Sequence, residues 1–340
     1  MRFTYLALST LMLLPLTSHA VVNGNPVSWD QYDDTVRLDN STNMSLYCTA
    51  TLISGRYAIT AGHCVDDGGL DIMVPALGDG VPLNEQWKSP EYTDEYGRRA
   101  KDVGIVRVDT PIDYRHIQFL NIDEHSEGEP IVIRGFGSTI DTLNQAEFTF
   151  SHYNYADHYY VYADTVNESH TTGGDSGAAW TISDDSHEEI FAIHRGSARF
   201  TTGERETYGT TIQSVQNFIS ETIDGWHYPT LADTDENGKA TITIQSLHRD
   251  DVVDTAWGDN VTITGGTCLD GLINPFEKCT YLIESNGGEG KLFLSDSESI
   301  HINKPQDNSG GGNNSSGDSG GSMGIWALML LGLANLRRKH

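Results

Sequence analysis

The feature that most limits how this chain can fold is a series of short stretches, between residues 21 and 222, in which apolar and polar residues alternate. Glycine, aspartate, asparagine and proline separate these stretches. Alternation with a period of two is typical of half-buried β-strands, and the separating residues favour turns. We therefore expect an all-β domain over residues 21–225. The clearest predicted strands are Tyr57–Thr60, Val103–Val108, Ile131–Phe136 and Phe148–Tyr153.

Beyond these strands the sequence predicts a helix and then a second, smaller β-domain. Within Thr211–Ile223 the apolar residues recur at helical spacing, which indicates one helix closing the first domain. Residues 226–304 contain further short alternating stretches, as in a small sandwich of immunoglobulin-like size. The spacing Cys268…Pro275…Cys279 resembles that of immunoglobulin-like modules on bacterial surface proteins. The predicted strands are Ala240–Ile244, Val261–Thr264, Thr280–Ile283 and Lys291–Leu294.

Both ends of the chain have the composition of targeting segments. Residues 1–20 combine an early arginine, an apolar run and a final alanine, which predicts a secretory signal peptide cleaved after Ala20. Residues 305–322 are rich in Asn, Ser, Gly and Asp and predict a flexible linker. Residues 323–340 form a hydrophobic segment with a basic tail, and its apolar run is short for a membrane span.

The net charge argues against two classes of binding partner, and the cysteines allow disulfides. The formal net charge of -27 at pH 7 argues against nucleic acid and against anionic membrane surfaces. The histidines are not at metal-ligand spacing, so we expect no catalytic metal and no cofactor; a structural calcium ion stays open in so acidic a chain. Four cysteines allow three pairings, and export permits disulfides. We expect Cys48–Cys64 and Cys268–Cys279, because each pair is close in sequence.

Three motifs supply the side chains of nucleophilic catalysis. TAGHC (60–64) contains His63, KDVGIV (101–106) contains Asp102, and TTGGDSGA (171–178) contains Ser176. A serine nucleophile needs a neighbouring base, and the base needs a third group that fixes its tautomer. The chain order His, Asp, Ser is that of the chymotrypsin-type proteases.

The residues around these motifs extend the resemblance. CTATLISGRYAITAGHC (48–64) and KDVGIVRVDTP (101–111) resemble the trypsin/chymotrypsin family, over Val21 to about Ile223. The resemblance implies a chymotrypsin-like double β-barrel and a serine endopeptidase that works through an acyl-enzyme. In it His63 is the general base, Asp102 orients the base and Ser176 is the nucleophile. The amides of Gly174 and Ser176 would form the oxyanion hole.

The start of the predicted mature chain fits the same family. VVNG (21–24) resembles the first residues of mature members, whose new α-amino group pairs with the aspartate before the catalytic serine. The matching pair here is Val21 and Asp175. One departure is Ala178-Ala179, where the family usually has Gly-Pro, and this puts the local strand geometry in question. A second GDSGG (317–321) lies in the linker and is interpreted as a chance match.

The substrate pocket is the least constrained part of the prediction. The position that carries an aspartate in trypsin-like pockets is His170 here. TTGGDSG and FAIHRGS are instead similar to motifs of bacterial glutamyl endopeptidases, in which a Thr and a His bind the substrate carboxylate. The matching residues are Thr171 and His194, with Ser197 a further donor, so cleavage after acidic residues is expected. Trypsin-like or apolar specificity on the same fold is the alternative.

The C-terminal segment and the partners complete these expectations. Gly320-Gly321-Ser322, the apolar run and the basic tail resemble the GlyGly-type sorting signal of Gram-negative secreted proteins, which a membrane protease removes. We therefore expect a monomer that acts on polypeptides, is exported through the periplasm to the cell surface or medium, and contacts a membrane transiently. A plain C-terminal anchor is the alternative for the tail. A catalytically inert pseudoprotease or adhesin is the alternative of another class.

Overall fold

The computed structural model describes residues 21–305 except 44, 46, 67–68, 94–99, 155–157 and 184–186. The predicted signal peptide, the linker beyond Pro305, the second GDSGG and the sorting segment therefore lie outside the described residues. Residues 305–340 separate from the rest of the chain as a unit of their own, and the fold below is that of the unit ending at Lys304. In the described part of the chain, no helix has the length and apolar character that crossing a membrane requires.

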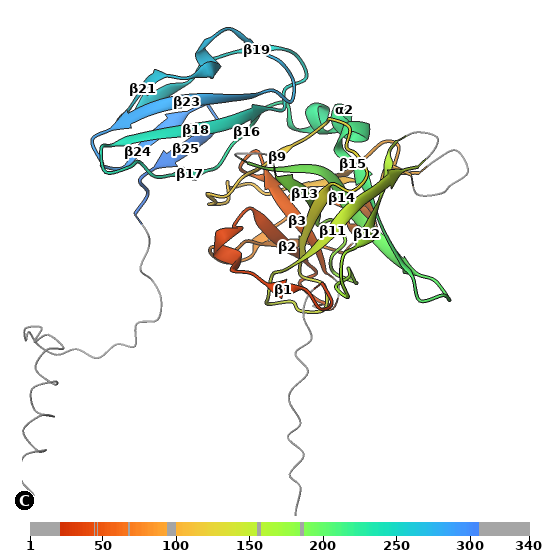
Figure 1. Ribbon diagram of the computed structural model, residues 1–340. Helices are drawn as coiled ribbons and strands as arrows, with labels where there is room; N and C mark the ends of the chain where they lie inside the picture. Colours follow the sequence, from red (N-terminus) through yellow and green to blue (C-terminus); the bar gives the residue numbers. More distant parts are fainter. Residues whose placement is uncertain are drawn as a thin grey trace, which may run out of the picture. The chain divides into compact units, whose positions relative to one another are not determined.

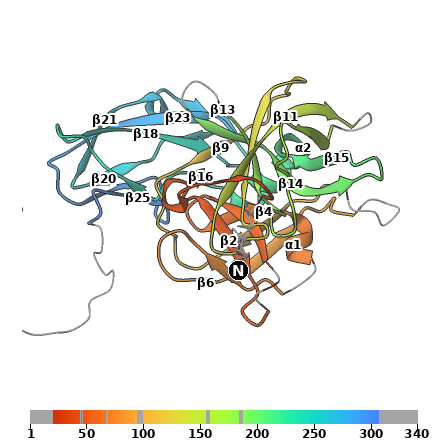
Figure 2. The same cartoon turned by 60° about the horizontal axis from the view of Figure 1, so that its bottom comes forward.

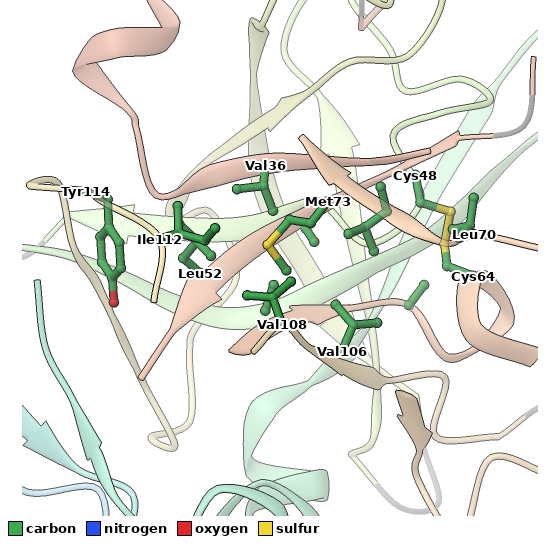
Figure 3. Close-up of a cluster of buried hydrophobic side chains, with 14 residues drawn as sticks. Val36, Cys48, Leu52, Cys64, Leu70, Met73, Val106, Val108, Ile112 and Tyr114 are labelled. Carbon is green, nitrogen blue, oxygen red and sulfur yellow. A yellow bond between two sulfur atoms is a disulfide. The ribbon is translucent and has the colours of Figure 1, made fainter. Parts of the chain in front are cut away.

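The first half of the all-β domain is a seven-stranded antiparallel sheet, in the order β6-β5-β2-β3-β4-β8-β7. Its inward-facing apolar residues form one buried cluster (Figure 3), which has the Cys48–Cys64 disulfide at one end, beside Leu70, and Tyr114 at the other. The strands are β2 Thr35–Asp39, β3 Tyr47–Ile53, β4 Tyr57–Thr60, β5 Ile72–Val74, β6 Val81–Pro82, β7 Glu85–Lys88 and β8 Gly104–Arg107.

The second half is an eight-stranded sheet that closes on itself (Figure 1). Six of its strands form a ring, β11-β10-β13-β14-β15-β12, because β12 pairs back with β11. β1 extends the sheet at β11, and β9 runs parallel to β14. The strands are β1 Asn25–Pro26, β9 Gln118–Leu120, β10 Pro130–Gly135, β11 Asn144–Tyr153, β12 Tyr160–Thr165, β13 Ala179–Ser183, β14 Glu188–Arg199 and β15 Arg205–Thr211. The predicted chymotrypsin-like double barrel is confirmed.

Another apolar cluster contains residues of both sheets and buries one face of the closing helix, α2 (Ile212–Ile223). Ile212, Val215 and Ile219 are buried there, at the spacing that predicted the helix. The helix ends at Ile223 and is capped by Asp224, which has a left-handed backbone and whose amide bonds to the carbonyl of Ser220. Besides α2, the barrel domain has two short helices among its described residues that the sequence did not predict, the 3-10 helix η1 (Trp29–Gln31) and the helix α1 (Gly62–Asp66).

Residues after Gly225 form two four-stranded sheets, in the orders β16-β18-β23-β21 and β17-β25-β24-β20, with a small β19-β22 pair. Apolar residues of both larger sheets share one buried cluster, as expected for a sandwich. The Cys268–Cys279 disulfide ties the 3-10 helix η2 (Thr267–Leu269) to β23. The strands are β16 Trp226–His227, β17 Leu231–Ala232, β18 Lys239–Ser246, β19 Val252–Val253, β20 Trp257–Asp259, β21 Val261–Gly265, β22 Leu272–Ile273, β23 Lys278–Ser285, β24 Gly290–Phe293 and β25 Ser299–Ile302.

Buried polar side chains fasten these later strands to the barrel domain. The Gln245 side chain accepts from the amide of Leu120 at 2.9 Å and donates to its carbonyl at 2.7 Å, so it satisfies both backbone groups of one β9 residue. The His227 ring accepts from the Ser54 amide at 3.2 Å and donates to the Gln118 carbonyl at 2.9 Å. Since an unpaired buried polar group costs about 1–3 kcal/mol, these contacts specify how the two parts meet.

Candidate active site

His63 and Asp102 are brought together by the register of two strands. β4 pairs with β8 so that Thr60 is opposite Gly104, and Asp102 lies just before β8. The helix α1 directly follows β4 (Figure 2). Asp102 is fully buried. Its Oδ2 lies 2.8 Å from His63 Nδ1, and its Oδ1 accepts from the His63 amide at 2.8 Å. A carboxylate on Nδ1 keeps the proton on that nitrogen and leaves Nε2 as an acceptor.

The loop that carries Ser176 packs against β3 and against Cys64, the residue after His63. The Ser176 carbonyl accepts from the Thr49 amide at 2.9 Å and lies 3.8 Å from Cys64 Sγ, next to His63 in sequence. Gly177 has φ +84°, and a Cβ there would lie 2.0 Å from Thr60 Oγ1. Gly174 has φ +100°, and a Cβ there would lie 2.3 Å from the Tyr47 ring. Gly174 and Gly177 are therefore required by backbone conformation and close approach.

The described hydrogen bonds leave the reactive groups of this loop available. Among the residues that the structure describes, no bond joins Ser176 Oγ to the His63 ring, a contact that is often long before substrate binds. Within the same residues, the amides of Gly174 and Ser176 donate to no acceptor. Two unpaired amides beside a serine can receive a developing oxyanion.

Asp175 is a buried carboxylate held by backbone amides. Its Oδ1 accepts from Gly137 and its Oδ2 from Thr172, each at 2.8 Å. Burial raises the pKa of Asp175 to about 7, even though both amides favour the ionised form. Val21 is fully buried in the apolar cluster that contains Ala178, three residues beyond Asp175. Its φ of +43° is an uncommon conformation for a β-branched residue.

The predicted pocket residues are only partly brought together. Ser197 Oγ donates to the Thr171 carbonyl at 3.2 Å, and the His194 backbone bonds to Gly177 and Ala178 of the serine loop. His170 differs, since its amide bonds to Val22 and its ring nitrogen lies 3.0 Å from the Glu168 carbonyl. Ser197 therefore contacts Thr171, while His194 contacts the serine loop through its backbone. His170 is bonded to Val22 and lies beside the Glu168 carbonyl.

The His194 ring is uncharged at neutral pH. It is buried and stacked on Trp180, whose Nε1 donates to His194 Nδ1 at 3.3 Å. Because the indole nitrogen only donates, the ring proton is on Nε2. Burial lowers the pKa of His194 to about 3, and the neighbouring His63 acts in the same direction. His194 can therefore offer a hydrogen bond to a ligand, but no positive charge.

Two residues near the site were missed by the sequence reasoning. Thr207 of β15 lies opposite Ser197 and is fully buried. In the described structure neither Thr207 Oγ1 nor Thr171 Oγ1, both buried, has a hydrogen-bond partner. Arg195 of β14 points to the triad, with Nε 3.5 Å from Asp102 Oδ2. A polar residue on the inward face of a strand is the only signal for Thr207, and it appears only once the strand pairing is known.

A grouping of Cys48, His63 and Cys64 could at first sight hold a metal ion. The two sulfurs are bonded to each other, so neither is a free thiolate ligand. The disulfide instead links β3 to α1 and so fixes the short helix that carries His63. Both expected disulfides are present.

Comparison with known proteins identifies the family of the chain. A model of the trypsin family matches residues 21–219. Snake venom serine protease 3 of Protobothrops jerdonii is 26% identical over 151 residues, covering 40% of this chain and 57% of that protein. Thrombin-like enzyme calobin-1 of Gloydius ussuriensis is 28% identical over 145 residues, covering 38% of this chain and 55% of that protein. The chain thus spans about half the length of the curated relatives it matches.

A solved structure is also similar to this chain at low identity. The VesB protease of Vibrio cholerae superposes with a TM-score of 0.49 at 15% identity, covering 82% of this chain and 96% of that one. The family model matches well over half of the described residues and includes all three catalytic motifs. This chain belongs to the trypsin family.

Proposed function

We propose that this chain is a serine endopeptidase that cleaves peptide bonds through an acyl-enzyme. The observation that carries the proposal is the His63–Asp102 pair, with a buried carboxylate 2.8 Å from Nδ1, held beside the Ser176 loop. His63 Nε2 takes the proton of Ser176 Oγ as that oxygen bonds to the substrate carbonyl carbon. The amides of Gly174 and Ser176 bind the oxyanion. His63 then gives the proton to the leaving amine, and water hydrolyses the ester by the same route.

A pseudoprotease or adhesin on the same fold is the competing function. Such a protein would need neither an oriented histidine nor a loop with two unpaired amides. The Asp102 carboxylate is buried and accepts two hydrogen bonds from His63, which is a costly arrangement for a surface that only binds. This supports the enzyme.

We further propose that activation follows removal of residues 1–20. A free ammonium at Val21 would compensate Asp175, a carboxylate whose described partners are backbone amides. The burial of Val21 in the cluster beside the serine loop supports this pairing. Its left-handed φ supports it too, because cleavage before Val21 removes the constraint on that torsion.

For the P1 residue we propose an acidic side chain. The buried hydroxyls of Thr171 and Thr207 lack acceptors in the described structure, and a substrate carboxylate would supply one. Ser197 lies between them, bonded to Thr171 and opposite Thr207 on the strand pair. We propose that His194 adds an Nε2–H donor, since its Nδ1 accepts from Trp180 and its backbone bonds to the serine loop. Trypsin-like Arg or Lys specificity is disfavoured, because no carboxylate belongs to this group of residues.

Secretion and processing complete the proposal. Residues 1–20 would be removed by signal peptidase, and the GlyGly-type segment 323–340 by a membrane protease, to give a cell-surface or released enzyme that works as a monomer. The two disulfides support an oxidising compartment.

The triad is tested by single and double substitution. Ser176→Ala and His63→Ala should each lower kcat by about 10⁴-fold or more, and the double variant should lose little beyond either one, because the residues act as one unit. Hydrolysis of a peptide library and labelling with a fluorophosphonate measure this. Ser319→Ala, in the second GDSGG, is the matched control and should keep full activity. Near-normal hydrolysis by Ser176→Ala would refute the assignment.

The role of Asp175 is tested by the pH dependence of stability. In a chain with one residue added before Val21, Asp175 keeps its pKa of about 7 when folded but titrates near 3.8 when unfolded. The folded state then binds the extra proton between these values, so stability is lost as pH rises from about 4 to about 7, by about 4 kcal/mol at most. Denaturant unfolding at several pH values measures the loss. Asp175→Asn and the chain beginning at Val21 should lack it; identical slopes in all three would contradict the pairing.

The pocket is tested with peptides that differ only at P1. Substrates with Glu should exceed those with Gln, Ala or Arg in kcat/KM. Thr171→Val and Thr207→Val should each lower kcat/KM for Glu by about tenfold to hundredfold and leave Ala cleavage unchanged, because each removes a hydrogen bond to a charge. Thr201→Val, at an exposed threonine, is the control. The preference should persist through neutral pH, since His194 carries no charge there. Efficient cleavage after Arg and none after Glu would restore the trypsin-like alternative.

Processing is tested by intact mass. Protein recovered from the medium of the expressing bacterium should begin at Val21 and lack Met323–His340, with the second cut in or just after the linker. Full-length protein held in the inner membrane would contradict the sorting signal and favour a plain anchor.

A further inference from the structure

Arg195 occupies an unusual place beside the catalytic pair. It lies on β14, at the point where the pairing with β15 shifts register between His194 and Gly196. Its Nε is 3.5 Å from Asp102 Oδ2, the same oxygen that His63 Nδ1 contacts at 2.8 Å. A cation and an imidazole therefore share one buried carboxylate oxygen.

The guanidinium is held from several sides. Its central carbon lies 4.5 Å from the centroid of the Tyr160 ring and 6.0 Å from that of Tyr208. Its Nη1 is 3.5 Å from the Ala100 carbonyl, two residues before Asp102. The side chain is only 15% exposed, so solvent screens it less than a surface arginine.

Building on the proposed function, we propose that Arg195 is a positioning residue that acts through Asp102 and keeps the general base His63 unprotonated at lower pH. A carboxylate beside a histidine favours the protonated ring, and a cation on that carboxylate opposes this effect. Arg195 also restrains Asp102 Oδ2 from a second direction, which keeps the carboxylate facing Nδ1.

Among the described residues, the basic side chains recorded within 4 Å of the Asp102 carboxylate are His63 and Arg195. His194, next to it on β14, is uncharged at neutral pH. Lys101, which precedes Asp102, is paired with Glu91 at 2.8 Å. Tyr160 and Tyr208 contribute ring faces, which stabilise a cation.

The consequence is a shift in the acid limb of the rate profile. Without the Arg195 charge, His63 takes up a proton at higher pH, so activity on the acid side falls while the plateau changes less. For a partly screened charge at this distance we expect a loss of about three- to tenfold on the acid limb.

The experiment compares four variants in the processed protein, the chain that begins at Val21. Arg195→Gln removes the charge and keeps a donor, Arg195→Met removes both, and Arg195→Lys keeps the charge. Arg199→Gln makes the same charge change at an exposed position of β14 and is the control. Two readouts are taken against pH: the rate of labelling by a fluorophosphonate, which needs no P1 preference, and the NMR titration of the His63 ring in a Ser176→Ala background.

The proposal predicts that Arg195→Gln and Arg195→Met move both profiles to higher pH, while Arg195→Lys and Arg199→Gln follow the parent protein. An unmoved His63 titration in Arg195→Gln and Arg195→Met, each checked to be folded by circular dichroism, would overturn it. So would an equal loss of rate at every pH, since that indicates a structural or substrate-contact role. If the parent protein does not react with the reagent but the titration still moves, the endopeptidase proposal fails and the role of Arg195 stands.

Discussion

The burial of the Asp102 carboxylate is the constraint on which the site depends. A charge with no solvent contact must be fully bonded, and His63 supplies both a backbone and a ring donor. Those two bonds are possible because β4 and β8 pair in one register and because the Cys48–Cys64 disulfide fixes α1. The Ser176 loop then approaches this frame so closely that only glycine fits at position 177. The fold and the proposed chemistry therefore both depend on the contact between Asp102 and His63.

The same strands connect the site to the rest of the molecule. β14 pairs with β9 at Glu188–Ile190 and carries His194 and Arg195 further along. The Gln245 side chain in turn bonds to both the amide and the carbonyl of Leu120 in β9. The C-terminal sandwich thus braces the strand system that leads to the pocket, which gives it a structural role besides any binding it performs.

Much of this could be predicted from the sequence, and what was missed has physical reasons. Tyr57–Thr60 was predicted with its observed ends, since alternation and flanking turn residues act locally. The motifs around His63, Asp102 and Ser176 could be recognised because each extends over several neighbouring residues. Thr207 and Arg195 could not be found, because what singles them out is strand pairing, a shift of register and a contact to Asp102 far away in sequence. The neutrality of His194 was also hidden, because it follows from burial against Trp180.

A crystal structure of the protein after reaction with a fluorophosphonate tests the central claim most directly. The account predicts phosphorus bonded to Ser176 Oγ, with the phosphoryl oxygen about 3 Å from the amides of Gly174 and Ser176 and His63 still bonded to Asp102. An adduct on another side chain, or an oxygen turned away from both amides, would contradict it.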